Sequence, residues 1–507
     1  MSQTLSRKKS LYERYTDIMP KGAGALFFIQ MFATFAYSVL YSTLVLYATN
    51  GLHMPDTVAN GVTSSFIAFN YALHLLGGYV GGRFMSYRSL FSVGMALQVV
   101  GCIFISMPTT NALYWGLAAF LTGAGLNVTC INCMLTQLFQ PEDKRREAAF
   151  LWNYSGMNVG FFIGFSVSGY LQLQNAYHML FLLAGAGNVI TLFLTLSHWG
   201  KLCDTKTTYL NLPEDQKRTA LFKGILSITA LALSLRLLLE NASVSNNLIM
   251  TVGVITIFII GYFALTQPNA AASKKIWAYL ILALASVIFW ALYQMAPMGL
   301  NLFIERNVDR HYLGILIAPQ WVQNINTVII ITGGPLLSVF FSWLRDRGVN
   351  ISIPIQFSFA LLIIGVGLAI LPIGIHLADA NGYVGFNWIL LSYICQSVGE
   401  LFISPIGYAM VGQLAPVNLQ GPMMGIWMMT TGVGATLSGY FSNLALSSTT
   451  STNPVLSNPG FSHAFGLLGW ISIVTGVALF IFTPFVLRLT QEKRLFAKKQ
   501  MISPAGL

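Results

Sequence analysis

The sequence predicts an all-α integral membrane protein in which two bundles of six transmembrane helices flank two inserted helices, fourteen in all. Of its 507 residues, 55% are hydrophobic and only 8% are charged, whereas soluble domains have about 25% charged residues. The apolar residues gather in runs long enough to span a bilayer, and polar or basic segments separate these runs. Composition and run length together exclude a soluble globular protein.

The apolar runs follow one another as a set of six, a pair and a second set of six. They cover 23–49, 59–82, 89–107, 111–138, 146–170 and 178–198, then 220–239 and 246–266, then 276–304, 312–344, 352–376, 384–412, 420–446 and 463–487. We therefore expect a cytoplasmic tail at 1–22, a bundle at 23–198, a linker with two inserted helices at 199–275, a bundle at 276–487 and a cytoplasmic tail at 488–507.

The basic residues report how the chain lies in the membrane. Nearly all of the 27 Lys and Arg fall in the two tails or in alternate loops. This positive-inside pattern predicts that both termini are cytoplasmic. The net charge of +11 is thereby explained by topology, and no nucleic-acid partner is expected.

The two halves carry matching loops after their second helices. Arg83 and Arg88 follow the second helix of the first half, and Arg345 and Arg347 follow the second helix of the later half. Corresponding short basic loops in two six-helix halves are typical of the major facilitator fold, whose halves rock about a midplane site. Gly and Pro residues within the spans permit close helix approach and bends.

One carboxylate stands out among the apolar runs. Glu400 is the only formal charge between Asp379 and Arg488, and a charge at bilayer depth costs at least roughly 2.5–3.5 kcal/mol. A fold retains such a group where it faces a polar cavity with a fixed cation, a proton or a substrate amine as its partner. A purely structural role is the weaker interpretation, because no buried Lys or Arg is evident to pair with it.

Enzyme activity is not expected. The sequence has no Walker loop, no Gly-rich dinucleotide turn, no metal-spaced His cluster and no nucleophile elbow. We therefore predict no catalytic residue, no cofactor and no metal site. Cys130 and Cys133 have CxxC spacing, but within a span they are better explained as small packing residues.

The later half resembles the proton-dependent oligopeptide transporters, the POT or PTR family, from about residue 287 to residue 445. The resemblance is carried by the run 396–411 around Glu400, by the segment 421–427, by Phe289-Trp290 and by Asn326. The two inserted helices also fit bacterial members. The resemblance implies a multi-pass transporter of the bacterial inner membrane that takes up peptides.

The resemblance also implies site residues. In the family, the positions of Glu400 and Asn326 bracket the amino terminus of the substrate, and those of Trp290 and Trp427 wall the side-chain pockets. A carboxylate with amides can receive the three donors of an ammonium group, and aromatic faces attract it further. The substrate-binding candidates are Glu400, Asn326, Asn158, Trp290, Trp427, Tyr37, Tyr71 and Tyr41. The proton-coupling candidates are Glu400 and His74.

The first half departs from the family. Where the first-helix motif has two glutamates and an arginine, this chain has Gln30, Ala33 and Thr34. The fourth-helix lysine is replaced by Val128 and the seventh-helix acid by Gln294 or its neighbour Tyr293. Since both signs of charge are missing, no orphan charge remains. We expect ligands that do not need a free carboxy terminus.

Three functions remain open at this point. The first is peptide uptake with altered proton coupling, and the second is transport of a non-peptide metabolite such as a siderophore, a modified amino acid or another natural product. The third is a transport-inactive receptor on the same fold. The expected partners are a small substrate, membrane lipid and, as a candidate coupling ion, the proton, and the chain is expected to act as a monomer.

Overall fold

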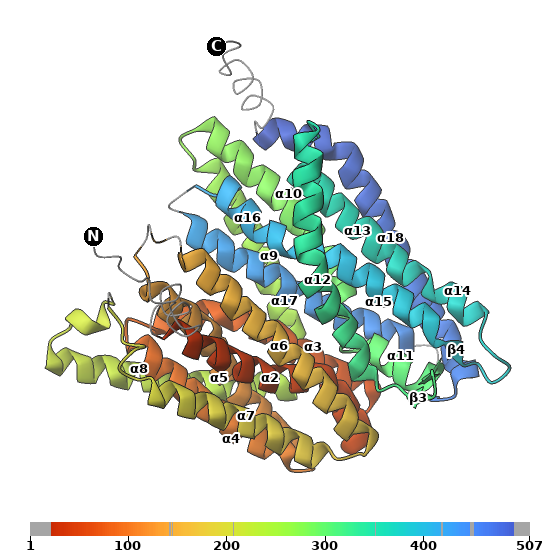
Figure 1. The fold of residues 1–507 in the computed structure, drawn as a ribbon, viewed down its shortest axis with the longest axis horizontal. Coiled ribbons are helices and arrows are strands. Elements are labelled where there is room, and N and C mark those ends of the chain that lie inside the picture. The colour runs from red at the N-terminus through yellow and green to blue at the C-terminus, as the bar shows by residue number, and fades with distance from the viewer. Residues whose placement is uncertain are drawn as a thin grey trace, which may run out of the picture. The chain divides into compact units, whose positions relative to one another are not determined.

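We describe the protein from a computed structural model, which defines residues 22–140, 143, 145–205, 207–349, 351–416, 419–446 and 451–490. Almost all of the described chain is helical (Figure 1). Helices suit these apolar runs because they satisfy every backbone polar group within one segment. Lys144 and nearly all of the two predicted tails lie outside the described residues.

The first eight predicted helices are present. In the first set, α2 is Ala23–Leu46 and continues as a π turn at Tyr47–Gly51, α3 is Asp56–Val80, α4 is Tyr87–Ser106, α5 is Thr110–Gln137, α6 is Arg145–Leu173 and α7 is Tyr177–Ser197. A 3-10 turn at Tyr209–Asn211 precedes the inserted helices α8, Glu214–Glu240, and α9, Ala242–Leu265.

The last six predicted helices are present too, but three of them are divided. The elements are α10, Ala270–Tyr293, and α11, Gly299–Asn307; α12, Pro319–Asp346; α13, Ile353–Ala369, and α14, Leu371–His376; α15, Phe386–Leu401, and α16, Ser404–Leu414; α17, Gln420–Leu446; and α18, Pro454–Thr490. Each division lies beside a proline, Pro297, Pro372 or Pro405, which lacks the N–H that a continuous helix needs.

Short strands lie near the ends of α11 and α15. Strand β1, Val308–Asp309, pairs in parallel with β4, Val384–Gly385, and β2, His311–Tyr312, pairs antiparallel with β3, Ile315–Leu316. The run predicted as one helix from 312 therefore begins as a hairpin, and α12 starts at Pro319.

Eleven helical segments of the described chain are long and apolar enough to cross a membrane. The helices α3, α6 and α17 are not among them. Each of the three is interrupted by polar or small residues, such as Asn60 and Asn70 in α3 and Asn153 and Asn158 in α6. Polar residues within a span are typical of helices that line a pathway.

The chain divides into two compact units. The first contains residues 22–40, 73–164 and 178–236 of the described chain, and the second contains 41–72, 165–177 and 237–490. This division cuts across the predicted bundles, because one end of α2, α3 and α6 belongs to the second unit. The bundle boundaries remain a prediction.

Within the first unit, α4 and α5 pack at backbone distance. A Cβ added to Gly123 would overlap the carbonyl oxygen of Gly94, so the two helices could not approach as closely with a larger residue at this position. Leu26, Phe91 and Ile131 are buried in the core of this unit. Small residues at helix contacts are the usual means of packing in a membrane, where apolar burial alone gives little attraction.

The linker after α7 is also anchored in the first unit. The backbone N–H of Tyr87 donates to both carboxylate oxygens of Asp204, at 3.1 and 3.0 Å, at the start of α4. Tyr209 N–H donates to the carbonyl of Gly82 at 2.8 Å. Burial raises the pKa of the Asp204 carboxyl above its ordinary value, although the Tyr87 hydrogen bonds oppose this.

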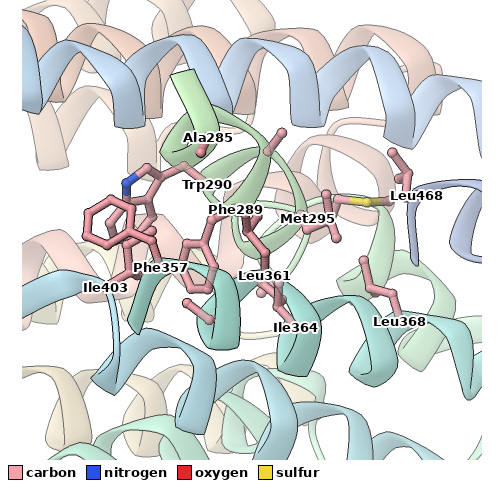
Figure 2. Close-up of a cluster of buried hydrophobic side chains, with 14 of the residues drawn as sticks. Ala285, Phe289, Trp290, Met295, Phe357, Leu361, Ile364, Leu368, Ile403 and Leu468 are labelled. Atoms are coloured by element: carbon pink, nitrogen blue, oxygen red, sulfur yellow. The ribbon is translucent and has the colours of Figure 1, made fainter. Parts of the chain in front are cut away.

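In the second unit, α13 lies beside α18 and α10 beside α17 (Figure 1). The inserted helix α9 packs on α10 and α17. Figure 2 shows the apolar core between these helices, with Phe289 and Trp290 of α10 near Phe357 of α13.

Candidate substrate-binding site

The carboxylate of Glu400 is held by an amide. Asn326 of α12 donates from Nδ2 to Oε2 of Glu400 at 2.7 Å, and Tyr293 of α10 also interacts with this carboxylate. Glu400 lies in the last turn of α15, where the helix dipole disfavours a negative charge. The side chain is only partly buried. The structure thus gives Glu400 neutral partners while leaving part of it accessible.

Two tyrosines from the first half of the sequence interact with Gln294, which follows Tyr293. The hydroxyl of Tyr41, on α2, donates to Oε1 of Gln294 at 2.9 Å. Tyr71, on α3, also interacts with Gln294 and lies within electrostatic range of Glu400. All of these residues belong to the second unit. The structure therefore brings Tyr41 and Tyr71 together with Glu400 and Asn326, while their role in binding remains a prediction.

The two candidate tryptophans, Trp290 and Trp427, are both buried but have different neighbours. Trp290 makes an edge contact with the ring of Tyr293, with centroids 5.6 Å apart. Its indole Nε1 is buried and has no hydrogen-bond partner among the described residues. Trp427 is 2% exposed and packs against Phe357, with centroids 6.0 Å apart. Both tryptophans thus belong to the apolar core, and Trp290 also adjoins the Glu400 site through Tyr293.

Three other candidates belong to the first unit. Tyr37 contacts the ring of Phe161 edge-on, and Asn158 donates from Nδ2 to the carbonyl of Tyr154 at 2.9 Å. The carbonyl of His74 accepts from the hydroxyl of Thr129 at 2.8 Å. Because the placement of this unit against the second is not defined, the convergence of Tyr37, His74 and Asn158 with Glu400 remains a prediction.

The first-helix positions that lack charge form a neutral network. Gln30 donates from Nε2 to the hydroxyl of Thr34 at 2.9 Å, and Asn153 of α6 donates from Nδ2 to Oε1 of Gln30 at 3.4 Å. Each of these groups can donate as well as accept hydrogen bonds. At these positions the chain thus offers amides and a hydroxyl, and it offers neither a cation nor an acid.

Tyr293 was not assigned to the substrate site from the sequence. Its ring stacks on Phe289, with centroids 5.9 Å apart, while its hydroxyl reaches Glu400. Its position in the sequence could have indicated this role, because residues three and four positions apart lie on the same face of a helix. Tyr293 follows Trp290 by three positions and Phe289 by four.

A second polar cluster joins helix ends within the second unit. Both terminal nitrogens of Arg306 donate to the Asp56 carboxylate, at 2.5 and 2.9 Å. Arg310 pairs with Glu305 at 3.4 Å, and Glu305 also accepts from Gln172 at 3.4 Å. These contacts tie the start of α3 and the end of α6 to the segment that follows α10.

We also searched the described part of the chain for metal ligands. Within those ranges, no three His, Cys, Asp or Glu side chains are grouped to hold a metal ion.

The sequence of this chain is similar to those of known proteins. A model described as the POT family matches residues 88–458. Dipeptide and tripeptide permease A of Salmonella typhi is 29% identical over 477 residues, which cover 93% of this chain and 94% of the permease. The protein of the same name in Escherichia coli K12 is 29% identical over 477 residues, with the same coverage.

Solved structures agree with the sequence comparison. A crystal structure of a mutant peptide transporter POT in complex with sulfate has a TM-score of 0.82 at 25% identity, and the match covers 95% of this chain and 97% of that chain. A POT family transporter in complex with 5-aminolevulinic acid has a TM-score of 0.79 at 24% identity, and the match covers 92% and 97%. Because the family model spans most of the sequence and the fold agrees along nearly all of it, this chain belongs to the POT family.

Proposed function

We propose that this protein is a secondary transporter that carries small peptides or peptide-like amines across the bacterial inner membrane by alternating access. Membership of the POT family supports this, as do relatives named dipeptide and tripeptide permease that align along almost the whole chain. The apolar helices fit a multi-pass membrane protein. Transport of a non-peptide metabolite and a receptor without transport activity are not favoured by these relatives.

The observation that carries the proposal is the hydrogen bond from the Asn326 amide to the carboxylate of Glu400, a residue that is only partly buried. An ammonium group has three donors and a full charge, and a carboxylate with an adjacent amide oxygen matches both features. The face of Tyr293 or Trp290 adds cation–π attraction at close range. In this proposal Glu400 binds the amino end of the substrate, and Asn326 orients the carboxylate.

Alternating access needs contacts that form and break at the ends of the helices. The Asp56–Arg306 ion pair and the Tyr41–Gln294 hydrogen bond join helices from the two halves of the sequence. The positive-inside pattern predicts that Asp56 and Arg306 face the outside. We propose that these contacts close the outer side of the pathway and separate when substrate enters from there.

Energy coupling has two candidate modes. Glu400 takes up a proton during the cycle and so couples transport to the proton gradient, or the substrate gradient alone drives a facilitator. We favour coupling through Glu400, because a facilitator has no need of a carboxylate at this depth. His74 is the second candidate for this role.

The proposal is tested by binding to the purified full-length protein. Thermal stabilisation is measured with a library of dipeptides, tripeptides and non-peptide amines and siderophores, since a ligand that binds only the folded state raises the unfolding temperature. We expect stabilisation by peptides with a free amine and a smaller stabilisation in Glu400→Gln. Glu214→Gln, an equal change at the exposed start of α8, is the control. Stabilisation by non-peptide compounds alone would contradict the proposal.

A further inference from the structure

The groups around Glu400 make its charge balance unusual for a membrane site. Asn326 and Tyr293 act on the carboxylate, and Tyr71 is in electrostatic range. All three are neutral, and no lysine or arginine among the described residues acts on it. The structure therefore leaves the negative charge of Glu400 to be balanced by what binds there.

The basic residues of the described chain lie mostly away from the middle of the spans. Lys and Arg occur at 7–21, 83–88, 144–146, 201–223, 236, 274–275, 306–310, 345–347 and 488–499. Among the described residues, all of these positions except Lys223 and Arg236, both within the inserted helix α8, lie near helix ends or in loops. Arg236 is committed elsewhere, since it donates to Asn111 at 2.8 Å and lies over the ring of Tyr114.

A zwitterionic peptide would therefore place one charge too many in the site. Its ammonium group balances ionised Glu400, but outside the inserted helix α8 the described spans hold no Lys or Arg away from their ends to pair with its carboxylate. An unpaired buried charge is strongly unfavourable. A peptide whose carboxyl end is amidated, esterified or conjugated has a net charge of about +1 at neutral pH and leaves the site neutral.

We propose, on the basis of the proposed function, that the preferred substrates are small cationic peptide-like compounds: a free amino end that pairs with Glu400 and an uncharged amide, ester or conjugate in place of the free carboxylate. Glu400 is then the residue that selects for net positive charge, and Asn326 and Tyr293 hold it in position. This preference separates the protein from a carrier of unmodified dipeptides.

The test compares matched ligands on the purified full-length protein at neutral pH. Alanyl-alanine, leucyl-glycine and phenylalanyl-alanine are each titrated as the free acid, as the carboxamide and as the N-acetylated carboxamide, by calorimetry. We expect the carboxamides to bind at least about tenfold more tightly than the acids and the acetylated forms not to bind. In Glu400→Gln the ratio of the two affinities should fall toward one, whereas Glu214→Gln should keep it.

The outcomes distinguish this inference from the function on which it rests. Free acids that bind as tightly as the carboxamides, or more tightly, overturn the inference and leave peptide transport standing. A carboxamide preference that survives in Glu400→Gln also overturns it, because the selection would then come from another group. If no acid or amide binds, the proposed function fails together with the inference.

Discussion

At the scale of single residues, the main question is how the protein tolerates a carboxylate within its spans. Glu400 lies at the carboxyl end of α15, and its close partners Asn326 and Tyr293 are neutral. These hydrogen bonds offset part of the desolvation of the carboxylate, but they do not neutralise it. A group in this position is therefore poised to bind a cation or a proton.

The orienting role of Asn326 leads to the first prediction. Replacing Asn326 by Ala removes a hydrogen bond to a charged group, and such bonds contribute about 1.5–3 kcal/mol, or roughly 10- to 150-fold in affinity. We expect the Kd for a bound peptide-like amine to rise by that factor, measured by calorimetry. Gln267→Ala, an amide change on the α9–α10 connection, should leave the Kd unchanged. Equal Kd values for Asn326→Ala and the wild type would show that the amide does not hold the carboxylate for binding.

The second prediction concerns the pH dependence of stability and rests on Asp204, which lies in the linker after α7, outside the spans. Because burial raises the pKa of Asp204 in the folded protein, the stability that its protonated form contributes is present at low pH and is lost as the pH rises through the folded-state pKa. Asp204→Asn is neutral throughout. We expect the wild type to lose stability relative to this variant as the pH rises above about 4, the ordinary pKa of an aspartate.

This pH dependence is measured as thermal unfolding of both proteins in the same detergent at several pH values. Asp215→Asn, on the exposed first turn of α8, is the charge-matched control. A difference between the wild type and Asp204→Asn that stays constant with pH, or that changes in the opposite direction, would contradict the assignment.

At the scale of helices, a polar cluster fixes the inserted helix α9 within the second unit. The side-chain oxygen of Asn246 accepts from the hydroxyls of Ser64, at 3.4 Å, and Ser65, at 3.2 Å, both on α3. The neighbouring Asn247 accepts from Tyr440 of α17 at 3.3 Å. The inserted helix is thus joined by hydrogen bonds to helices from both halves of the sequence.

These contacts lead to the third prediction. Asn246→Ala removes the acceptor for two buried hydroxyls, and a hydrogen bond between membrane helices contributes about 0.6 kcal/mol on average and up to about 1.7 kcal/mol. We expect a stability loss of about that size, seen as a lower unfolding temperature. Asn247→Ala removes one exposed contact and should lower the temperature less. A larger effect at 247 than at 246 would argue against the cluster.

The fourth prediction tests the close packing of α4 and α5. Gly123→Ala places a Cβ where the Gly94 carbonyl lies, so the helices must separate, and overpacking of this kind costs about 1–3 kcal/mol. Gly412→Ala on α16 is the matched control, because nothing lies within 4 Å of its added Cβ. The higher helix propensity of Ala at this position should stabilise the protein by up to about 1 kcal/mol. Unfolding temperatures should rank Gly123→Ala below the wild type and Gly412→Ala at or above it, and the reverse order would contradict the packing.

Much of this element structure was predictable from the sequence, because apolar runs of spanning length have no alternative to the helix in a bilayer. All fourteen predicted runs contain a helix, but the breaks beside Pro297 and Pro372 and the hairpin before Pro319 were not predicted. Hydropathy stays high through a break, since the residues on both sides are apolar. The exact end of a helix depends on tertiary contacts that a single sequence does not reveal.

The site was predictable to a different degree. Glu400 and Asn326 followed from an isolated charge and a motif, and the structure joins them directly. Tyr293 and the Asp56–Arg306 pair were not predicted, because each needs knowledge of which helices are neighbours. Residues far apart in the sequence come into contact only when their helices pack together, and a single sequence says little about which helices are neighbours.

At the scale of the whole molecule, this is a POT family protein with a carboxylate, Glu400, in the spans of its later half and neutral polar residues at the first-helix motif positions of its first half. We propose that it transports small peptide-like amines with Glu400 as the binding carboxylate. Binding alone would also suit a receptor, so movement of substrate across a membrane is the deciding property.

The most direct measurement is uptake of a radiolabelled peptide-like amine, chosen from the binding screen, into liposomes that contain the purified protein, with and without an inwardly directed proton gradient. We expect saturable uptake by the wild type, stimulation by the gradient, retention of both in Glu214→Gln and loss of uptake in Glu400→Gln. Uptake that ignores the gradient would show a facilitator. Uptake by the wild type no greater than in protein-free liposomes, for ligands that bind, would contradict the central claim.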